Sequence, residues 1–273
     1  MKKTKILSVF LAGVLALGLA GCGSSNSNEK AEDKTIKIGV SAVPHEEIVN
    51  EVKPLIEKEG YTLDVVVYDD YVTPNTALAE GEIDANYFQH IAYLNETNES
   101  KKLDLVNVAE IHIEPMAAYS KTIKDLTAIK DGGTIAVPND PSNEARALRL
   151  LEKAGLIKVK EGNLVTVKDI TENTKNLQFK ELEAAQLPRT LDEVDVAVIN
   201  GNYALQAGLD ANKDGIYIED KNDENIKDMR NVLVVKKGNE ETEKTKVLKK
   251  ALTSDECKKF IEEKYNGTVI PVF

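Results

Sequence analysis

Residues 35–68 read TIKIGVSAVPHEEIVNEVKPLIEKEGYTLDVVVY, and this segment sets the fold class of the chain. Apolar and polar side chains alternate over 35–40, which predicts a strand. A helix is expected near Glu46–Glu59, with its apolar residues on one face and Gly60 at its end. Residues 63–68 are almost continuously apolar, which is typical of a strand buried on both faces. The segment is therefore a strand–helix–strand unit.

The same rhythm returns later in the chain. A strand is expected at 134–137, a helix at 143–154, and further strands at 165–170, 178–182 and 194–199. Alternating strands and helices predict parallel sheets with helices on both faces. Two such runs predict an α/β protein with two lobes. Ligands bind at the carboxyl ends of the strands in such folds, so we expect the site in the cleft between the lobes.

The N-terminus has the pattern of a secretory signal peptide over residues 1–21. Three lysines precede an apolar run, Ile6–Leu19, and small residues lead directly to Cys22. The alternative, a short membrane-spanning anchor, has only about 14 apolar residues where roughly 20 are needed. The Leu-Ala-Gly-Cys order resembles the bacterial lipobox. That resemblance implies cleavage before Cys22, a diacylglyceryl thioether on its sulfur and acylation of its new amino terminus. Several acyl chains anchor a protein stably at a membrane.

Charge and composition narrow the possible functions of the rest of the chain. Residues 22–34 carry almost no apolar side chains, which predicts a flexible tether. Without the leader, 32 basic residues face 46 acidic ones, a net charge of −14 that excludes nucleic-acid binding. Cys257 is the only other cysteine, so acylation of Cys22 leaves no internal disulfide. A helical pattern around Cys257 predicts a partly buried structural thiol.

The loop at 137–146, VPNDPSNEAR, joins a buried strand to a helix. Ser142 or Asn143 can cap that helix, and the free N–H groups of its first turn favour an anion. Arg146 could grip a carboxylate with two parallel hydrogen bonds. The alternative is an ordinary capped helix with a solvated arginine.

Aromatic residues gather in a second region. Five of the fourteen Phe and Tyr residues lie between Tyr68 and Tyr93, beside His90 and several amides. Such a group can form a pocket wall that is apolar in its body and polar at its tips. The alternative is ordinary core packing, where most aromatic residues are found.

Several motifs together resemble one family. They are DYV at 70–72, PN at 74–75, IDANYFQH at 83–90, VPNDP at 137–141, ELEA at 181–184 with QLPR at 186–189, and AVIN at 197–200. In this order they resemble the NlpA/MetQ family of methionine-binding lipoproteins over about residues 35–270. The resemblance implies a two-lobed, type II periplasmic-binding-protein fold. Lobe 1 would comprise 35–117 plus 231–273, and lobe 2 would comprise 118–230.

The same resemblance implies a function and a set of site residues. The chain would capture methionine in the interlobe cleft and deliver it to the permease and ATPase of an ABC importer, without a cofactor. Tyr71, Phe88, His90 and Tyr93 match the family's pocket for the thioether side chain. Arg146, with Asn143 beside it, matches the arginine that holds the carboxylate. Asn200 matches a contact to the head group, and Asn231 matches a ligand asparagine near the return crossing.

Three other functions remain open. A metal-capturing lipoprotein would need more ligands than the only histidines, His45, His90 and His112, supply, and His45 is expected to be a solvated loop residue. An extracellular enzyme is disfavoured, because the sequence has no G-x-S-x-G, H-E-x-x-H or P-loop motif. A binder of another amino acid or of a methionine-containing dipeptide differs only in cleft volume. For the methionine binder, we expect Arg146→Ala to abolish binding while the apo protein unfolds at nearly the same temperature.

Overall fold

The first of two large sheets is built from both ends of the described chain. The computed structural model describes residues 33–273, apart from the side chains of 224 and 225, and Lys34–Phe273 form one compact unit. The six strands run in the order β13-β4-β12-β3-β1-β2. Their bounds are β1 (Thr35–Val40), β2 (Thr62–Val67), β3 (Ala85–His90), β4 (Leu105–Ile113), β12 (Arg230–Lys236) and β13 (Ile270–Pro271).

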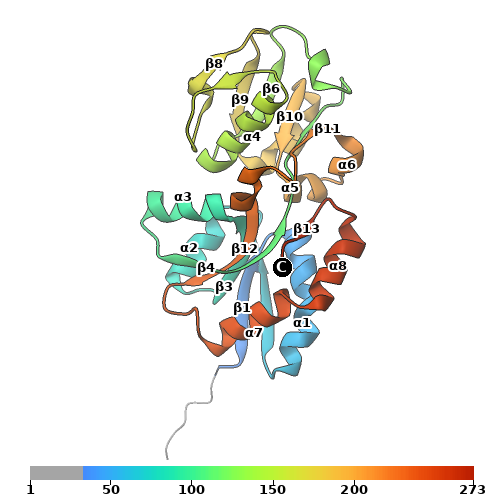
Figure 1. Ribbon diagram of the computed structural model, residues 1–273. Coiled ribbons are helices and arrows are strands. Elements are labelled where there is room, and N and C mark those ends of the chain that lie inside the picture. The colour runs from blue at the N-terminus through green and yellow to red at the C-terminus, as the bar shows by residue number, and fades with distance from the viewer. Residues whose placement is uncertain (1–32) are drawn as a thin grey trace, which may run out of the picture. The chain divides into compact units, whose positions relative to one another are not determined.

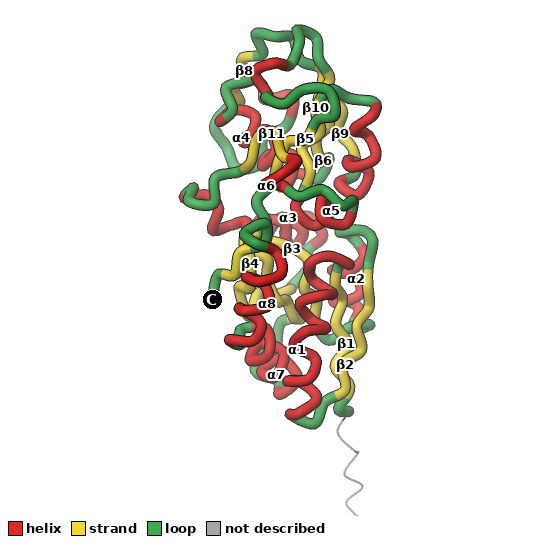
Figure 2. The backbone as a smooth tube through the Cα atoms, turned by 90° about the vertical axis from the view of Figure 1, so that its right-hand side faces the viewer, coloured by secondary structure: helices red, strands yellow, loops and turns green. Residues whose placement is uncertain are grey.

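Helices cover both faces of this sheet (Figure 1). They are α1 (Glu47–Lys58), α2 (Thr73–Glu80), α3 (Ile91–Lys101), α7 (Glu243–Leu252) and α8 (Asp255–Tyr265). On one face α1 packs against both α7 and α8, as Figure 2 shows. On the other face lie α2 and α3. Strand β12 shows the resulting pattern, because Leu233 and Val235 enter one core while Val232 and Val234 enter the other.

The second large sheet has five strands in the order β11-β5-β10-β6-β9. Their bounds are β5 (Ala117–Tyr119), β6 (Thr134–Pro138), β9 (Gln178–Leu182), β10 (Val196–Ile199) and β11 (Gly215–Ile218). The helices α4 (Pro141–Lys153), α5 (Gly201–Gln206) and α6 (Ala211–Asp214) accompany it, with the 3₁₀ segment η4 (Ala184–Asp192). A small separate ladder joins β7 (Lys158–Val159) to β8 (Ile170–Glu172). The short helical turns are η1 (Ala42–Glu46), η2 (Leu126–Ala128), η3 (Val167–Asp169) and η5 (Glu224–Met229).

The chain passes between the two sheets twice. It leaves the first sheet after β4 and enters the second at β5, and it returns between β11 and β12. The strands that follow the strand–helix rhythm, β1 to β3 and β6, β9 and β10, pair in parallel as expected. The strands beside the crossings pair antiparallel, so both sheets are mixed. The architecture is a two-lobed α/β fold.

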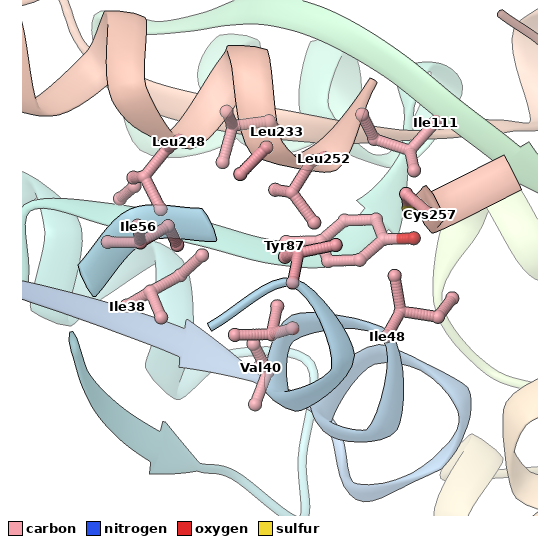
Figure 3. Close-up of a cluster of buried hydrophobic side chains, with 14 of the residues drawn as sticks. Ile38, Val40, Ile48, Ile56, Tyr87, Ile111, Leu233, Leu248, Leu252 and Cys257 are labelled. Atoms are coloured by element: carbon pink, nitrogen blue, oxygen red, sulfur yellow. The ribbon is translucent and has the colours of Figure 1, made fainter. Parts of the chain in front are cut away.

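The core of the first lobe contains the thiol of Cys257. Figure 3 shows it among Ile48, Tyr87, Ile111 and Leu252, on the side of the sheet covered by α1, α7 and α8. Cys257 is fully buried, rather than partly buried as the sequence suggested. Burial raises the pKa of the thiol to about 12, so this cysteine is an inert core residue.

One expected strand is wrong. Residues 165–170 contain the 3₁₀ turn η3, and β8 begins only at Ile170. Both the backbone N–H and the hydroxyl of Thr166 donate to Asp169 Oδ2, each at 3.0 Å. This side-chain capping closes a turn where the apolar alternation alone favoured a strand. Among the described residues, no helix is both long and apolar enough to cross a membrane.

Candidate functional site

A cavity lies where the two lobes meet, and residues of both lobes line it. All eight residues that the resemblance selected line it: Tyr71, Phe88, His90, Tyr93, Asn143, Arg146, Asn200 and Asn231. Four further residues complete the lining: Gln89, Glu114, Gly201 and Asn202. The strand ends β3, β4 and β10 and the helix starts α3, α4 and α5 supply most of these side chains. The residues that the resemblance selected therefore lie together at one cavity, and four further residues share its wall.

Aromatic rings form one wall of the cavity. The ring centroid of Tyr71 lies 6.1 Å from that of Phe88 and 5.7 Å from that of Tyr93. The Tyr93 hydroxyl donates to the backbone oxygen of Tyr71 at 3.0 Å. Asp70 fixes the loop before α2, because its carboxylate accepts from the backbone N–H groups of Val72 and Thr73. The wall is thus apolar, and its Tyr71–Tyr93 edge is pinned by a hydrogen bond.

His90 joins this wall to the opposite lobe. It caps α3, because its Nδ1 accepts from the backbone N–H of Tyr93 at 3.1 Å. Its Nε2 therefore carries the proton and donates to Asn143 Oδ1 at 3.0 Å. Burial, together with the charge of Arg146, lowers the pKa of His90 to about 4. His90 is a neutral donor across the cleft.

Asp140, rather than Ser142 or Asn143, caps helix α4. Its Oδ1 accepts from the backbone N–H of Asn143 at 3.0 Å and from the Ser142 hydroxyl at 3.0 Å. The side-chain amide of Asn143 also donates to both Asp140 oxygens. The helix terminus that the sequence offered to an anionic ligand is therefore already occupied by this carboxylate. Asn143 is left to present its Oδ1 to the cavity wall.

Arg146 is buried, but it is not a free guanidinium. Its Nε and Nη2 donate to the two oxygens of Glu219 at 3.0 and 2.5 Å, and Nη2 also donates to the backbone oxygen of Glu114 at 2.8 Å. Nη1 has no hydrogen bond among the described residues. Burial alone would lower the pKa of Arg146, but the charge and hydrogen bonds of Glu219, together with the charge of Glu114, raise it overall. The residue is a permanent cation with one nitrogen left for a ligand.

The start of α5 brings two amides to the cavity. Asn200 Nδ2 donates to Asn143 Oδ1 at 2.7 Å, and the Tyr71 hydroxyl donates to Asn202 Oδ1 at 2.5 Å. The other two amide atoms, Asn200 Oδ1 and Asn202 Nδ2, are buried without a partner. Between them, Gly201 is required, because a Cβ there would lie 2.6 Å from the Cβ of Glu114. An acceptor and a donor at the cavity therefore have no protein partner.

A buried network supports the floor of the cavity around Glu114. His112 Nε2 lies 2.7 Å from Glu114 Oε1, and His45 Nε2 lies 3.5 Å from the same oxygen. His45 Nε2 also bonds to Asn231 Oδ1 at 3.1 Å, which ties the predicted ligand asparagine to the first loop. Burial raises the pKa of Glu114, whereas His45 and Arg146 oppose that rise. His45 is fully buried, so its expected position in a solvated loop is wrong.

His45, His112 and Glu114 form a group that could hold a metal ion. Their ligand atoms lie within 4.8 Å of one another. Both imidazoles, however, already have protein partners at both nitrogens, since His45 Nδ1 bonds to Ser41 and His112 Nδ1 bonds to Tyr87. Burial lowers the pKa of His45 to about 4 and that of His112 to about 3, so both rings are neutral donors and acceptors. The hydrogen bonds of the cluster are complete with protein groups alone.

The four lining residues that the sequence did not select had weak signals. Glu114 directly follows an apolar strand end and precedes Pro115, a position typical of a site in an α/β fold. Gln89 stands next to His90 inside the IDANYFQH motif, and Asn202 lies two residues after Asn200, just beyond the AVIN motif. Gly201 has no side chain that could signal a binding site. The need for glycine at this position becomes clear only from its close contact with Glu114.

Comparison with known sequences identifies the family of this chain. The family model for NlpA lipoproteins matches residues 36–273. The D-methionine-binding lipoprotein MetQ of Salmonella typhi is 44% identical over 274 residues, which cover 98% of each chain. The methionine-binding lipoprotein MetQ of Bacillus subtilis is 41% identical over 278 residues, covering 100% of this chain and 99% of the relative.

A solved structure agrees with these relatives. It is a nutrient-binding protein from Burkholderia cenocepacia bound to methionine, with 42% identity and a TM-score of 0.84. The match covers 87% of this chain and 100% of that one. Since the family model spans almost all of the described residues and the relatives exceed 40% identity over nearly their full length, the chain belongs to the NlpA lipoprotein family.

Proposed function

We propose that this chain is the substrate-binding lipoprotein of an ABC importer and that its ligand is methionine. The observation that carries the proposal is the cavity itself, where an aromatic wall faces one buried guanidinium, one buried carboxylate and two unsatisfied amide atoms. Methionine has a matching soft apolar side chain and a zwitterionic head group. The names of the relatives and the methionine-bound structural neighbour support this choice.

The polar side of the cavity fits the two charges of an amino acid. Arg146 Nη1 and Asn202 Nδ2 are donors without a partner, and both suit a carboxylate. Asn200 Oδ1 and the Glu114 carboxylate are acceptors and suit an ammonium group. Each charge-assisted hydrogen bond contributes about 1.5–3 kcal/mol. Each contact between the thioether sulfur and an aromatic ring adds about 0.3–1.5 kcal/mol. A few such contacts are enough for micromolar binding, about −8 kcal/mol.

The polar side of the cavity favours a single amino acid over a dipeptide. A dipeptide would place an uncharged peptide nitrogen where one of the two acceptors, Asn200 Oδ1 or the Glu114 carboxylate, expects an ammonium group. Methionine-containing dipeptides are therefore the second candidate, and the titration below compares them directly.

The location and lobe division complete the proposal. Cys22 and the preceding leader lie outside the described residues, and we propose that Cys22 carries the lipid that tethers the domain to the outer face of the cell membrane. We propose that residues 35–117 with 231–273 form lobe 1 and residues 118–230 form lobe 2. The two boundaries fall one residue inside β5 and β12, the strands that follow the two crossings. The protein binds and releases its ligand unchanged, for delivery to a permease and its ATPase.

Calorimetric titration of the ligand-stripped domain tests the ligand. We expect L-methionine to bind at micromolar affinity or tighter, and D-methionine, glycyl-methionine and other amino acids are compared on the same sample. Arg146→Ala should abolish methionine binding, because it removes the cation facing the carboxylate. The matched control is Arg149→Ala, because Arg149 lies on the same helix but bonds to Glu152 and to backbone oxygens away from the cavity. Equal binding by both variants would contradict the assignment.

Metal analysis of the purified protein tests the rival function. Methionine binding by protein that contains no zinc would support the present proposal. Stoichiometric zinc at His45, His112 and Glu114, with no amino-acid binding, would replace it with a metal-capturing role.

A further inference from the structure

The two crossing segments are bonded to each other beside the cavity. The backbone N–H of Glu219 donates to the backbone oxygen of Met116 at 2.9 Å. In return, the backbone N–H of Met116 donates to Glu219 Oε2 at 3.1 Å. Met116 lies on the way from β4 to β5, and Glu219 lies on the way from β11 to β12. In a two-lobed binding protein, a hinge motion must pass through such segments.

Arg146 connects this pair of crossings to the cavity. Its guanidinium is held in two parallel hydrogen bonds by Glu219 on one crossing, and it donates to the backbone oxygen of Glu114 on the other. The side chains of Arg146 and Glu219 are only 5% and 13% exposed, so the ion pair is little screened by water. Because Nε and Nη2 are used in these bonds, Nη1 is the guanidinium nitrogen that remains to bind a ligand.

We propose that Glu219 is a positioning residue that couples capture of the ligand's carboxylate to the hinge. This inference rests on the proposed amino-acid binding. Glu219 fixes the plane of the guanidinium so that Nη1 faces the cavity, and it ties Arg146 to both crossing segments. A carboxylate bound at Nη1 is then connected, through one side chain, to the two places where the lobes turn relative to each other. A ligand without a carboxylate cannot use this connection.

The alternative role for Glu219 is competition. A carboxylate that already pairs with Arg146 could reduce the attraction for an anionic ligand. Removal of its charge would then strengthen methionine binding, whereas removal of a positioning residue weakens it. The two roles predict opposite signs, so one substitution separates them.

The test uses Glu219→Gln, which keeps the shape of the side chain and an oxygen for the Met116 N–H. Methionine and methioninol, in which an alcohol replaces the carboxylate, are titrated by calorimetry. We expect Glu219→Gln to weaken methionine binding by about tenfold or more and methioninol binding by less than about threefold, within the range of known coupling energies. The matched control is Asp220→Asn, an exposed neighbour that does not contact Arg146.

Small-angle X-ray scattering supplies the second readout. We expect saturating methionine to reduce the radius of gyration of the wild-type protein more than that of the Glu219→Gln variant. Unchanged or tighter methionine binding, equal losses for both ligands, or an undiminished change in radius would overturn the role of Glu219 alone. A wild-type protein that binds neither ligand would overturn the proposed function and this inference with it.

Discussion

Glu114 is the residue whose protonation state matters most for the proposed ligand. Its carboxylate lines the cavity, and burial raises its pKa above the ordinary value of 4.5. A bound ammonium group needs the ionised form, so acid should weaken binding. The histidines around the cavity stay neutral above about pH 5, because His45, His90 and His112 have pKa values of about 4, 4 and 3. They therefore do not contribute to the pH dependence of binding in that range.

Glu114→Gln should therefore weaken methionine binding by about 10- to 100-fold, the equivalent of one charge-assisted hydrogen bond. Wild-type affinity should fall as the solution is made more acidic, whereas the variant should show a weaker dependence on pH. The control is Glu110→Gln on the same strand, because Glu110 pairs with Arg230 and does not line the cavity. A pH profile shared by wild type and Glu114→Gln would exclude an ionised Glu114 from ligand binding.

Arg146 shows how far single residues could be predicted from the sequence. Its place in the cavity wall followed from the motif, but its pairing with Glu219 joins residues 73 positions apart. That pairing changes the expected stability of Arg146→Ala, because loss of one partner leaves Glu219 as a poorly solvated charge. Breaking a buried pair costs about 3–5 kcal/mol. We now expect the apo variant to unfold at a clearly lower temperature in calorimetry, and an unchanged midpoint would show that water replaces the guanidinium at no cost.

Among the helices and strands, α4 matters most for the site, because it supplies Asn143 and Arg146 to the cavity wall. The strand–loop–helix order around 137–146 was readable from the sequence because turn and helix signals are local. The choice of cap was not, since Asp140, Ser142 and Asn143 are all good capping residues. The structure uses Asp140 to cap the helix and to hold Asn143, whose Oδ1 accepts from both His90 and Asn200. The cap therefore orders a hydrogen-bond junction between the lobes.

Asp140→Ala should affect both stability and binding. Loss of an N-cap costs about 0.5–2 kcal/mol, and release of Asn143 should weaken methionine binding by about tenfold. Ser254→Ala is the matched control, because Ser254 caps α8 through the Cys257 N–H and lies outside the cavity lining. It should lose comparable stability in urea denaturation and keep its affinity. Equal affinities in the two variants would show that the Asp140 cap has no role in the site.

At the scale of the whole molecule, the two-lobed fold was predictable because the strand–helix rhythm is regular in both halves of the chain. The pattern could not reveal which polar residues become buried. His45, His112 and Glu114 come from two segments that meet only when β12 pairs with β4 and Asn231 reaches His45. Their burial is a property of the folded chain, and it has a consequence for acid stability.

The unfolded chain should take up protons on these buried histidines before the folded protein does. Each has an ordinary pKa of 6.5 when unfolded and a pKa of about 4, 4 or 3 when folded, because burial disfavours the charged ring. Above pH 6.5 the histidines are neutral in both states and their full contribution to stability is present. As the pH falls from 6.5 toward 4, only the unfolded state gains protons, so the free energy of unfolding decreases. Each histidine contributes a slope of about 1.4 kcal/mol per pH unit.

Glu114 acts with the opposite sign, because its raised pKa lets the folded state hold a proton that the unfolded state has lost above pH 4.5. Asp140 and Glu144 also have raised pKa values, that of Glu144 about 7, so three carboxyl groups oppose the three histidines and reduce the net slope of the free energy of unfolding with pH. Urea denaturation at a series of pH values between about 6.5 and 4.5 measures this slope. His90→Gln keeps a hydrogen-bonding side chain beside Asn143. It should remove the contribution of one proton, about 1.4 kcal/mol per pH unit, from the pH dependence of the free energy of unfolding, without changing the dependence on urea. Identical slopes for the two proteins would mean that His90 is as easily protonated in the folded chain as in the unfolded one, which its complete burial and its bond to Asn143 oppose.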